Sequence, residues 1–258
     1  MSVHFVGAGP GAADLLTVRA TRLLGQADVV LFPGSYLDPR VLAHVSPHAD
    51  LVDTQNLDLD EITAHLIRAH RQGKEVVRLA SGDLSLYSAL AEQSARLDDA
   101  EVPWDVTPGV PAYAAAAAAV GRELTVPLLA QSVVLTRTQS RSSAMPHSES
   151  LTAYASTRAT LVLHLAITRT RELMAQIEPC YGPHCPVVVV HRASQPEELI
   201  LRGTVATIAA MVEQAELRMA AVVLVGWALD PGRDEQPYDR GESFLYDPAR
   251  DRTLKRRG

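Results

Sequence analysis

The chain opens with residues 3–12, VHFVGAGPGA, in which a short, mainly apolar run leads directly into three glycines. The run Val3 to Val6 predicts a buried β-strand, and the glycines predict a tight turn into a following helix. The loop Gly7 to Ala12 fits the loose pattern G-x-G-x-x-G/A of dinucleotide-binding folds. A strand, a glycine loop and a helix in this order are typical of a parallel α/β sheet, which we therefore expect.

This loop departs from a dinucleotide site in two ways. A Rossmann loop is followed about 20 residues later by an acidic residue at the end of the second strand. Here Asp28 comes before the second expected strand, Val29 to Phe32. Pro10 also removes one backbone N–H that could face a phosphate. Three interpretations therefore stay open: binding of a nucleotide phosphate, a tight turn with no ligand, and close approach of the backbone to some other ligand.

Strands and helices alternate along the rest of the chain, which predicts two α/β domains. We expect the domains at 1–121 and 131–246, separated by a segment of weak periodicity, with a frayed tail at 247–258. The strands expected in the first half are 3–6, 29–32, 76–79 and 104–106, with helices near 15–24, 59–67, 86–97 and 112–120. In the second half we expect strands at 132–136, 160–165, 187–190, 199–201 and 222–225, helices near 149–156, 169–177 and 205–212, and more β structure than in the first half.

Two further loops follow strands of the first half. Ser81-Gly82-Asp83 comes after the third strand, and residues 107–112, TPGVPA, come after the next. Because ligands of open α/β sheets bind at the carboxyl ends of strands, the three loops together predict a cleft there. Asp83 would accept hydrogen bonds from a ligand hydroxyl or amine, or would cap a helix. The alternative for residues 107–112 is a turn that leads a proline into the first helical turn.

Two arginines, Arg137 and Arg141, lie in a polar loop after the first strand of the second half. The guanidinium group suits carboxylate recognition because it donates two parallel hydrogen bonds. The alternative is a pair of solvated surface arginines.

Composition excludes several classes of protein. The charge of 24 − 30 = −6 argues against a general nucleic-acid binder, which would carry a basic face. Two cysteines give no disulfide framework. We expect no membrane span, because no run of about 18 uninterrupted apolar residues exists. With no signal-peptide pattern at the start, a cytoplasmic location is expected.

No strong metal or nucleophile motif is present. Cys180 and Cys185, with His184 and His191 nearby, fit zinc-ligand spacing only at its edge, so we expect no metal. The chain has no G-x-S-x-G elbow, no P-loop and no cysteine beside a clear base.

Five segments, taken in order, resemble the tetrapyrrole (precorrin) methylase family. They are VGAGPG at 6–11, QADVV at 26–30, SGDLSLY at 81–87, TPGVPA at 107–112 and QSVVLTR at 131–137. The resemblance extends from Val3 to Tyr246, and segments 81–88, 136–146 and 243–248 most resemble one branch of the family. In two places many relatives have Asp-Pro where this chain differs, with Ala12-Ala13-Asp14 after the first loop and Asp83-Leu84 in the second.

The resemblance implies two α/β domains with a cleft between them, assembled as a homodimer. It implies that S-adenosylmethionine lies folded in that cleft and methylates a tetrapyrrole, and that the fold is not that of the Rossmann methyltransferases. By motif position, the donor site would comprise Pro10, Ser81, Gly82, Asp83, Leu86, Pro111, Ala112, Leu165 and the backbone near Ala193. The tetrapyrrole would be bound by Gly9, Ser35, Tyr87, Arg137 and Arg141. No catalytic base is assigned.

Other functions stay open at this point. A sister enzyme of the family would methylate another ring carbon or a cobalt-containing ring. A Rossmann oxidoreductase would bind a nicotinamide cofactor, which a titration with each cofactor would detect. A non-enzymatic carrier would bind the tetrapyrrole and leave the methyl donor untouched.

Overall fold

The computed structural model describes residues 2–34, 37–138 and 145–230, and it divides into two compact units. The first unit comprises Met1–Ala119 together with Arg192–Leu199, and the second comprises Val120–His191 together with the chain from Ile200 onward. Each is built around a five-stranded sheet. The segment Arg192–Leu199 thus belongs to the first unit, although it lies within the range 131–246 expected for the second domain. The expected tail at 247–258 lies outside the described residues.

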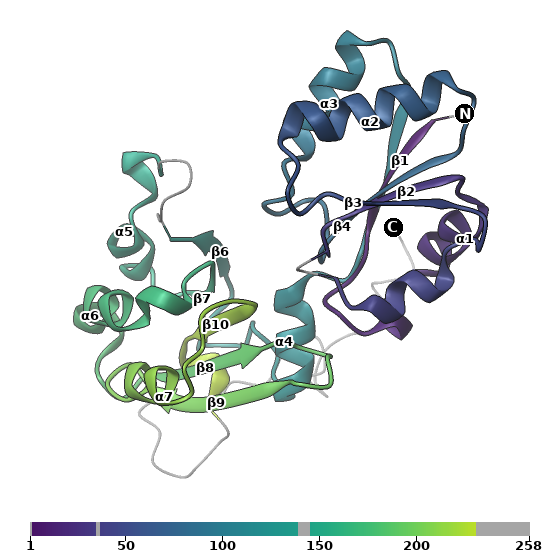
Figure 1. Ribbon diagram of the computed structural model, residues 1–258. Helices are drawn as coiled ribbons and strands as arrows, with labels where there is room; N and C mark the ends of the chain where they lie inside the picture. Colours follow the sequence, from purple (N-terminus) through teal and green to yellow (C-terminus); the bar gives the residue numbers. More distant parts are fainter. Residues whose placement is uncertain (1, 35–36, 139–144, 231–258) are drawn as a thin grey trace, which may run out of the picture. The chain divides into compact units, whose positions relative to one another are not determined.

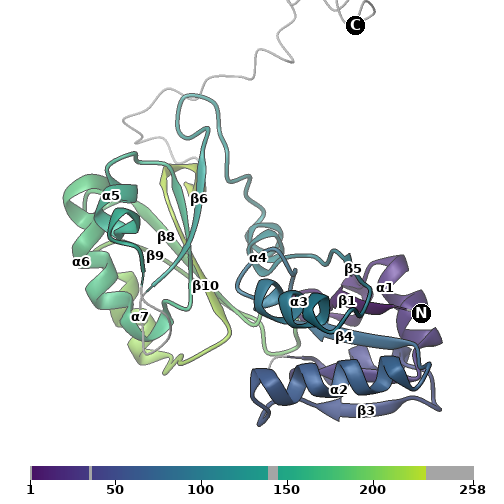
Figure 2. The same ribbon diagram turned by 90° about the horizontal axis from the view of Figure 1, so that it is seen from above.

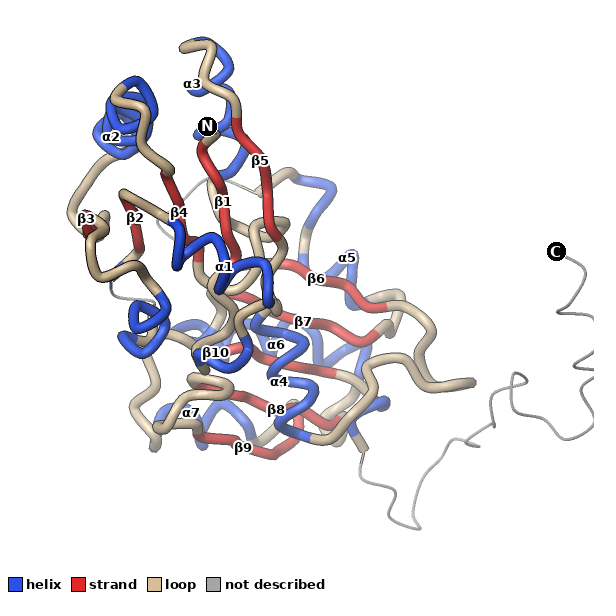
Figure 3. The backbone as a smooth tube through the Cα atoms, turned by 90° about the vertical axis from the view of Figure 1, so that its right-hand side faces the viewer, coloured by secondary structure: helices blue, strands red, loops and turns tan. Residues whose placement is uncertain are grey.

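The first sheet is parallel in every strand pair. It places β1 between β4 and β5, as Figure 3 shows. Its strand order is β3-β2-β4-β1-β5. The strands are β1 (Val3–Gly7), β2 (Val29–Phe32), β3 (Asp50–Asp53), β4 (Val76–Ala80) and β5 (Trp104–Thr107). Since parallel strands share their carboxyl edge, the loops after β1, β4 and β5 begin side by side.

Helices cover both faces of the first sheet (Figure 1). The α-helices are α1 (Val18–Gln26), α2 (Leu59–Arg71), α3 (Leu90–Asp99) and α4 (Ala112–Val120), and the 3-10 helices are η1 (Ala13–Leu15) and η3 (Pro39–His44). On one face Leu24 of α1 packs with Val30 and Leu79 of the sheet. On the other face Leu66 of α2 and Leu97 of α3 pack with the core around Phe5.

The second unit has a mixed sheet covered on one face by three helices (Figure 2). Its strands are β6 (Val133–Arg137), β7 (Thr160–His164), β8 (Pro186–His191), β9 (Leu199–Thr204) and β10 (Ala221–Val225), in the order β6-β7-β10-β8-β9. Its helices are α5 (Leu151–Ala155), α6 (Thr170–Tyr181) and α7 (Ile208–Gln214), with 3-10 helices η4 (His147–Glu149), η5 (Ile167–Arg169) and η6 (Trp227–Leu229). Leu163, Ile177 and Val223 belong to one apolar core between sheet and helices.

The structure corrects two expectations and confirms a third. The short edge strand β3 was not expected. Each unit has five strands among the described residues, and those of the second unit, where β8 and β9 are six residues long, contain more residues in total than those of the first, as expected. Helix α3 begins at Leu90, not near Leu86, because residues 83–89 form a loop.

None of the helices in the described residues is long and apolar enough to cross a lipid bilayer.

Candidate functional site

The loops after β1 and β4 are joined by backbone hydrogen bonds beyond the end of the sheet. The Ala8 N–H donates to the Ala80 carbonyl at 2.8 Å. Gly9 and Gly82 are joined by two reciprocal hydrogen bonds. The Gly9 N–H donates to the Gly82 oxygen at 3.1 Å, and the Gly82 N–H donates to the Gly9 oxygen at 2.8 Å. Both glycines have positive φ, 74° and 68°, a conformation that residues with a side chain rarely adopt. The two loops therefore form one small bridged platform.

The backbone of the third loop, after β5, packs closely against the backbone of this platform. A Cβ placed on Gly109 would lie 2.2 Å from the Gly82 carbonyl oxygen and 2.9 Å from the Gly7 carbonyl carbon. A Cβ on Gly7 would lie 2.5 Å from the Gly109 nitrogen. Gly7 and Gly109 thus allow the backbones of the loops to approach one another closely, and in the described structure the atoms beside them belong to these loops.

The carboxylate of Asp83 links the second loop to the third. Its Oδ1 accepts from the Ser85 N–H at 2.9 Å and from the Ser85 hydroxyl, and its Oδ2 accepts from the Gly109 N–H at 2.8 Å. Burial acts to raise the pKa of Asp83, but these hydrogen bonds outweigh it and hold the pKa below its ordinary value. The alternative role as a helix cap is wrong, because the N-cap of α3 is Ala89.

The loop at 84–89 has a buried leucine at its start and an exposed tyrosine in its middle. Leu84 is buried in the core of the first unit, and the Ser88 hydroxyl donates to its carbonyl at 2.6 Å. Tyr87 and Ala89 both have a φ of 54°, in the left-handed region. Tyr87 is 49% exposed, so the loop that follows the glycine platform in sequence offers an aromatic surface.

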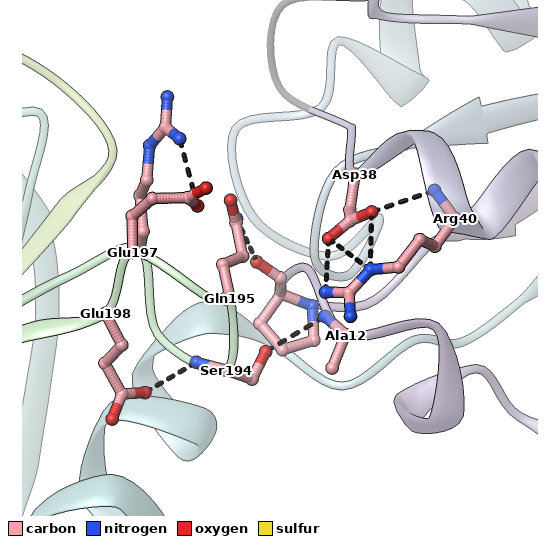
Figure 4. A network of polar contacts seen from close by, with 9 residues as sticks. Ala12, Asp38, Arg40, Ser194, Gln195, Glu197 and Glu198 are labelled. Atoms are coloured by element: carbon pink, nitrogen blue, oxygen red, sulfur yellow. Dashed lines mark hydrogen bonds and ion pairs between the residues drawn. The ribbon is translucent and has the colours of Figure 1, made fainter.

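A segment distant in sequence closes over the first loop (Figure 4). We name Arg192–Leu199 the strap. The Ser194 Oγ accepts from the Ala12 N–H at 3.1 Å, and the Gln195 Nε2 donates to the Pro10 carbonyl at 3.1 Å. The Gln195 side chain also occupies the space beside Gly11, where a Cβ would lie 2.2 Å from its Cγ. The strap therefore fixes the first loop from the side.

The residues assigned by resemblance fall into three groups. The first unit holds most of them: Gly9, Pro10, Ser81, Gly82, Asp83, Leu86, Tyr87, Pro111, Ala112 and Ala193. Within it Gly82 lies beside the Pro111–Ala112 step, since a Cβ there would be 3.7 Å from the Ala112 nitrogen. Leu165 and Arg137 belong to the second unit, at the ends of β7 and β6. Ser35 and Arg141 lie outside the described residues.

The two residues of this group in the second unit differ in exposure. Leu165 has a φ of 52° and is 57% exposed, and its carbonyl accepts from the Thr138 hydroxyl at 3.1 Å. Arg137 is half-buried and stands in register with His164 of β7, whose pKa is lowered by burial.

The buried cysteine, Cys185, contributes no reactive thiol. Burial raises the pKa of the Cys185 thiol to about 12, so it stays protonated at neutral pH. Among the residues that the structure describes, no group of three or more His, Cys, Asp or Glu side chains could hold a metal ion.

The sequence did not indicate the roles of Ser194, Gln195 and Ser85. Their types are common in loops, and their partners are backbone groups of other segments, so no periodic pattern marks them. The glycines and Asp83 were found because they directly follow strands.

The strap contacts lead to a prediction for the double variant Ser194→Ala, Gln195→Ala. It should lower the free energy of unfolding by about 1–3 kcal/mol, because two hydrogen bonds to loop backbone are lost. Amide exchange at Ala12 should rise, which hydrogen-exchange NMR would detect. Glu197→Ala, on the exposed part of the strap, is the matched control. Unchanged exchange at Ala12 in the double variant would show that the strap does not hold the loop.

Comparison with known proteins identifies relatives across the whole chain. The family model for Tetrapyrrole (Corrin/Porphyrin) Methylases matches residues 2–209. The precorrin-4 C(11)-methyltransferase of a Sinorhizobium species is 48% identical over 258 residues, which is 100% of both chains. The enzyme of that name from Mycobacterium tuberculosis H37Rv is 49% identical over 97% of this chain and 98% of its own. The cobalt-precorrin-4 C(11)-methyltransferase of Priestia megaterium is 39% identical over 96% and 95%.

Solved structures agree with this result. The X-ray structure of a cobalt precorrin-4 methyltransferase superposes with a TM-score of 0.86 at 38% identity, covering 89% of this chain and 96% of that one. A uroporphyrin-III C-methyltransferase from Thermus thermophilus, complexed with S-adenosylhomocysteine, superposes with a TM-score of 0.75 at 30% identity over 93% and 99%. The expected α/β fold, distinct from that of Rossmann methyltransferases, is confirmed. The chain belongs to the tetrapyrrole (corrin/porphyrin) methylases.

Proposed function

We propose that this protein transfers a methyl group from S-adenosylmethionine to carbon 11 of precorrin-4, in the biosynthesis of the corrin ring of cobalamin. The observation that supports it most is the 42–49% identity to precorrin-4 C(11)-methyltransferases over 96–100% of the chain. The branch resemblance at 81–88 and 136–146 agrees with this assignment, as does that at 243–248, although residues 139–144 and 243–248 lie outside the described part.

The described residues of the first unit fit a nucleoside-type methyl donor. Ser81 is exposed, and the Pro111–Ala112 step at the start of α4 is partly exposed beside Gly82. Leu86 adds a partly exposed apolar side chain. Backbone polar groups, a hydroxyl and an apolar side chain are what a ribose and an adenine need. The relative solved with S-adenosylhomocysteine supports the same cofactor class.

In this proposal the donor binds through Ser81, Gly82, Leu86, the Pro111–Ala112 step and the backbone near Ala193. The family resemblance also assigns Leu165 to the donor. When bound, S-adenosylmethionine supplies a sulfonium methyl group that is already activated. The protein then chiefly needs to align that methyl with a nucleophilic ring carbon and to exclude water. Asp83 and Pro10 act indirectly, because their hydrogen bonds hold the loops together.

The cobalt-containing form of precorrin-4 is the alternative substrate. Relatives of that name support it, but their identity to this chain, 35–39%, is lower than that of the cobalt-free enzymes. Incubation of the protein with each form and with isotopically labelled S-adenosylmethionine tests both, with NMR to locate the new methyl. A labelled methyl on carbon 11 of precorrin-4 is expected. A methyl on another carbon, or methylation of the cobalt form alone, would refute the assignment.

The cofactor can be tested separately by thermal unfolding. S-adenosylhomocysteine should raise the melting temperature, because a ligand that binds only the folded state stabilises it by about 2.7 kcal/mol at a hundred times its Kd. Nicotinamide dinucleotides should not. Stabilisation by the dinucleotides alone would favour the oxidoreductase, and tetrapyrrole binding without donor binding would favour a carrier.

Arg137 is proposed to bind a carboxylate of the substrate, together with Arg141. Arg137→Lys should raise the KM for precorrin-4 about tenfold and leave donor affinity unchanged, since lysine keeps the charge but loses the paired donors. Steady-state kinetics at two salt concentrations would measure this, because exposed charge pairs are screened over about 8–10 Å. Wild-type kinetics in the double variant Arg137→Ala, Arg141→Ala would leave both residues as surface arginines.

The protein is further proposed to be a homodimer, as the family resemblance implies. Light scattering should give twice the mass of one chain. A mass of one chain at the concentration used for activity would exclude the dimer as the active form.

A further inference from the structure

Arg78 is a buried charge in the middle of β4. Only 9% of the residue is exposed, and no ion pair to it exists among the described residues. Its Nε donates to the Gln93 Oε1 at 3.1 Å and its Nη1 donates to the Leu79 carbonyl at 2.9 Å. Burial lowers the pKa of Arg78 to about 10, which still leaves it charged at neutral pH.

Gln93 connects Arg78 to the loop at 84–89 through hydrogen bonds of its side-chain amide. It lies in α3 and is 3% exposed. Its Nε2 donates to the Ser88 carbonyl at 3.3 Å and to the Ala89 carbonyl at 3.1 Å. An arginine can only donate hydrogen bonds, so it fixes which end of the Gln93 amide carries the oxygen. The NH₂ group must then face the two carbonyls.

The loop held in this way is backbone-strained. Tyr87 and Ala89, on either side of Ser88, have left-handed φ values of 54°. Residues with a side chain are disfavoured in that region, so the conformation persists only where surrounding contacts fix it. The half-exposed Tyr87 ring is thus presented by a loop that Gln93 bonds from the buried side.

An apolar pair would fill the same space at lower cost. A buried charge without an opposite charge is unfavourable, and replacing buried polar groups by apolar side chains of similar volume is often neutral or stabilising. What an apolar pair lacks is the donor group aimed at the carbonyls of Ser88 and Ala89. The arrangement therefore has a use beyond packing.

We propose that Arg78 and Gln93 are positioning residues that hold the 84–89 loop and, through Tyr87, orient the tetrapyrrole for methylation. Neither residue is catalytic, since both are buried and act through the loop. The part of this inference that concerns the substrate rests on the proposed function, and the part that concerns the loop does not.

Gln93→Glu separates loop positioning from stability. The new carboxylate would still accept from Arg78 and would give it an ion pair, which offsets part of the stability lost with the two hydrogen bonds. It has no donor for the Ser88 and Ala89 carbonyls and would repel them. Amide exchange across residues 84–90 should rise about tenfold in the free protein, which is the order expected for the loss of two hydrogen bonds. The KM for precorrin-4 should rise by a similar factor, with S-adenosylhomocysteine affinity little changed.

Two further variants secure the interpretation. Arg78→Lys keeps a charge but has one donor group, so the same segment should exchange faster than in the wild type even if Gln93→Glu fails to fold. Arg96→Met is the control, because Arg96 lies on the same helix and pairs with Asp60, away from the loop. It should leave both exchange and KM as in the wild type.

The outcomes distinguish the two proposals. Unchanged exchange at 84–90 in folded Gln93→Glu and Arg78→Lys would overturn the positioning role. Faster exchange with an unchanged KM in an active enzyme would overturn the link to the substrate. Faster exchange in variants of a protein whose wild type does not methylate precorrin-4 would refute the proposed function and leave the loop role intact.

Discussion

Replacing Gly109 with alanine is expected to destabilise the first unit by about 3 kcal/mol or more and to abolish donor binding. The added Cβ would lie 2.2 Å from the Gly82 oxygen and 2.9 Å from Gly7, and all of these are backbone atoms. Flexible side chains can move aside, but these backbones continue into the central strands β1 and β4. Relief therefore requires the three loops to separate. Urea unfolding would give the stability change, and calorimetry with S-adenosylhomocysteine would give the binding change.

Gly25→Ala is the matched control with the opposite expected sign. Gly25 lies inside α1, and the nearest atom to an added Cβ is the His44 carbonyl oxygen at 3.9 Å. Alanine favours the helix by about 0.5–1 kcal/mol over glycine, so this variant should be more stable than the wild type. Equal stability of the Gly109 variant and the wild type would mean that the loops are not packed as described.

The second large effect is expected for Asp83→Ala. Removal of the carboxylate leaves the N–H groups of Ser85 and Gly109 without their acceptors, at a cost of about 1–3 kcal/mol each where water cannot replace them. The second and third loops would lose their only side-chain link among the described contacts, so donor affinity should fall at least about tenfold. Asp83→Asn should lose nearly as much, because its NH₂ group would face one of the two donors.

The same carboxylate predicts a pH dependence of stability. The pKa of Asp83 in the folded protein is lowered from 3.8, so the unfolded chain takes up the proton first as the pH falls. The stability it contributes is complete above pH 3.8 and is lost as the pH drops through the folded pKa. Asp83→Ala should therefore flatten the acid side of the stability profile below about pH 4, whereas Asp99→Ala, at an exposed position in α3, should not. Identical profiles for wild type and Asp83→Ala would remove the carboxylate from this role.

The sequence predicted the platform well because simple rules apply to it. Buried strands ending in glycine place their loops at one edge of a parallel sheet, which located Gly82 and Gly109 and singled out Asp83. The same rules gave α4 at Ala112–Val120 and β2 at Val29–Phe32 with the bounds that the structure has. What they could not give is the partner of each group, such as the bond from Gly109 to Asp83.

The misses have physical causes. β3 is four residues long, Asp50-Leu51-Val52-Asp53, and lies at the edge of the sheet with charged ends, so it shows little apolar signal. The spacing of Leu86, Leu90 and Leu97 suits a helix, but Tyr87 and Ala89 have left-handed φ values, which a helix does not allow. Side-chain hydrogen bonds to the Leu84 and Ala89 carbonyls accompany this loop conformation. The strap contacts join residues 182 and 185 positions apart, and local patterns carry no information about them.

The strap also has a consequence for how the chain matures on the ribosome. The main part of the first unit ends at Ala119, and its last segment ends at Leu199, which is 199 − 119 = 80 residues later. At about 5–20 residues per second, translation needs roughly 4–16 s to supply that segment. During this interval the Pro10 carbonyl and the Ala12 N–H lack the partners they have in the finished protein. A gene fragment ending at Ala119 would encode that same incomplete unit, so the first half of the nascent chain must wait for most of the second before it can reach its final form.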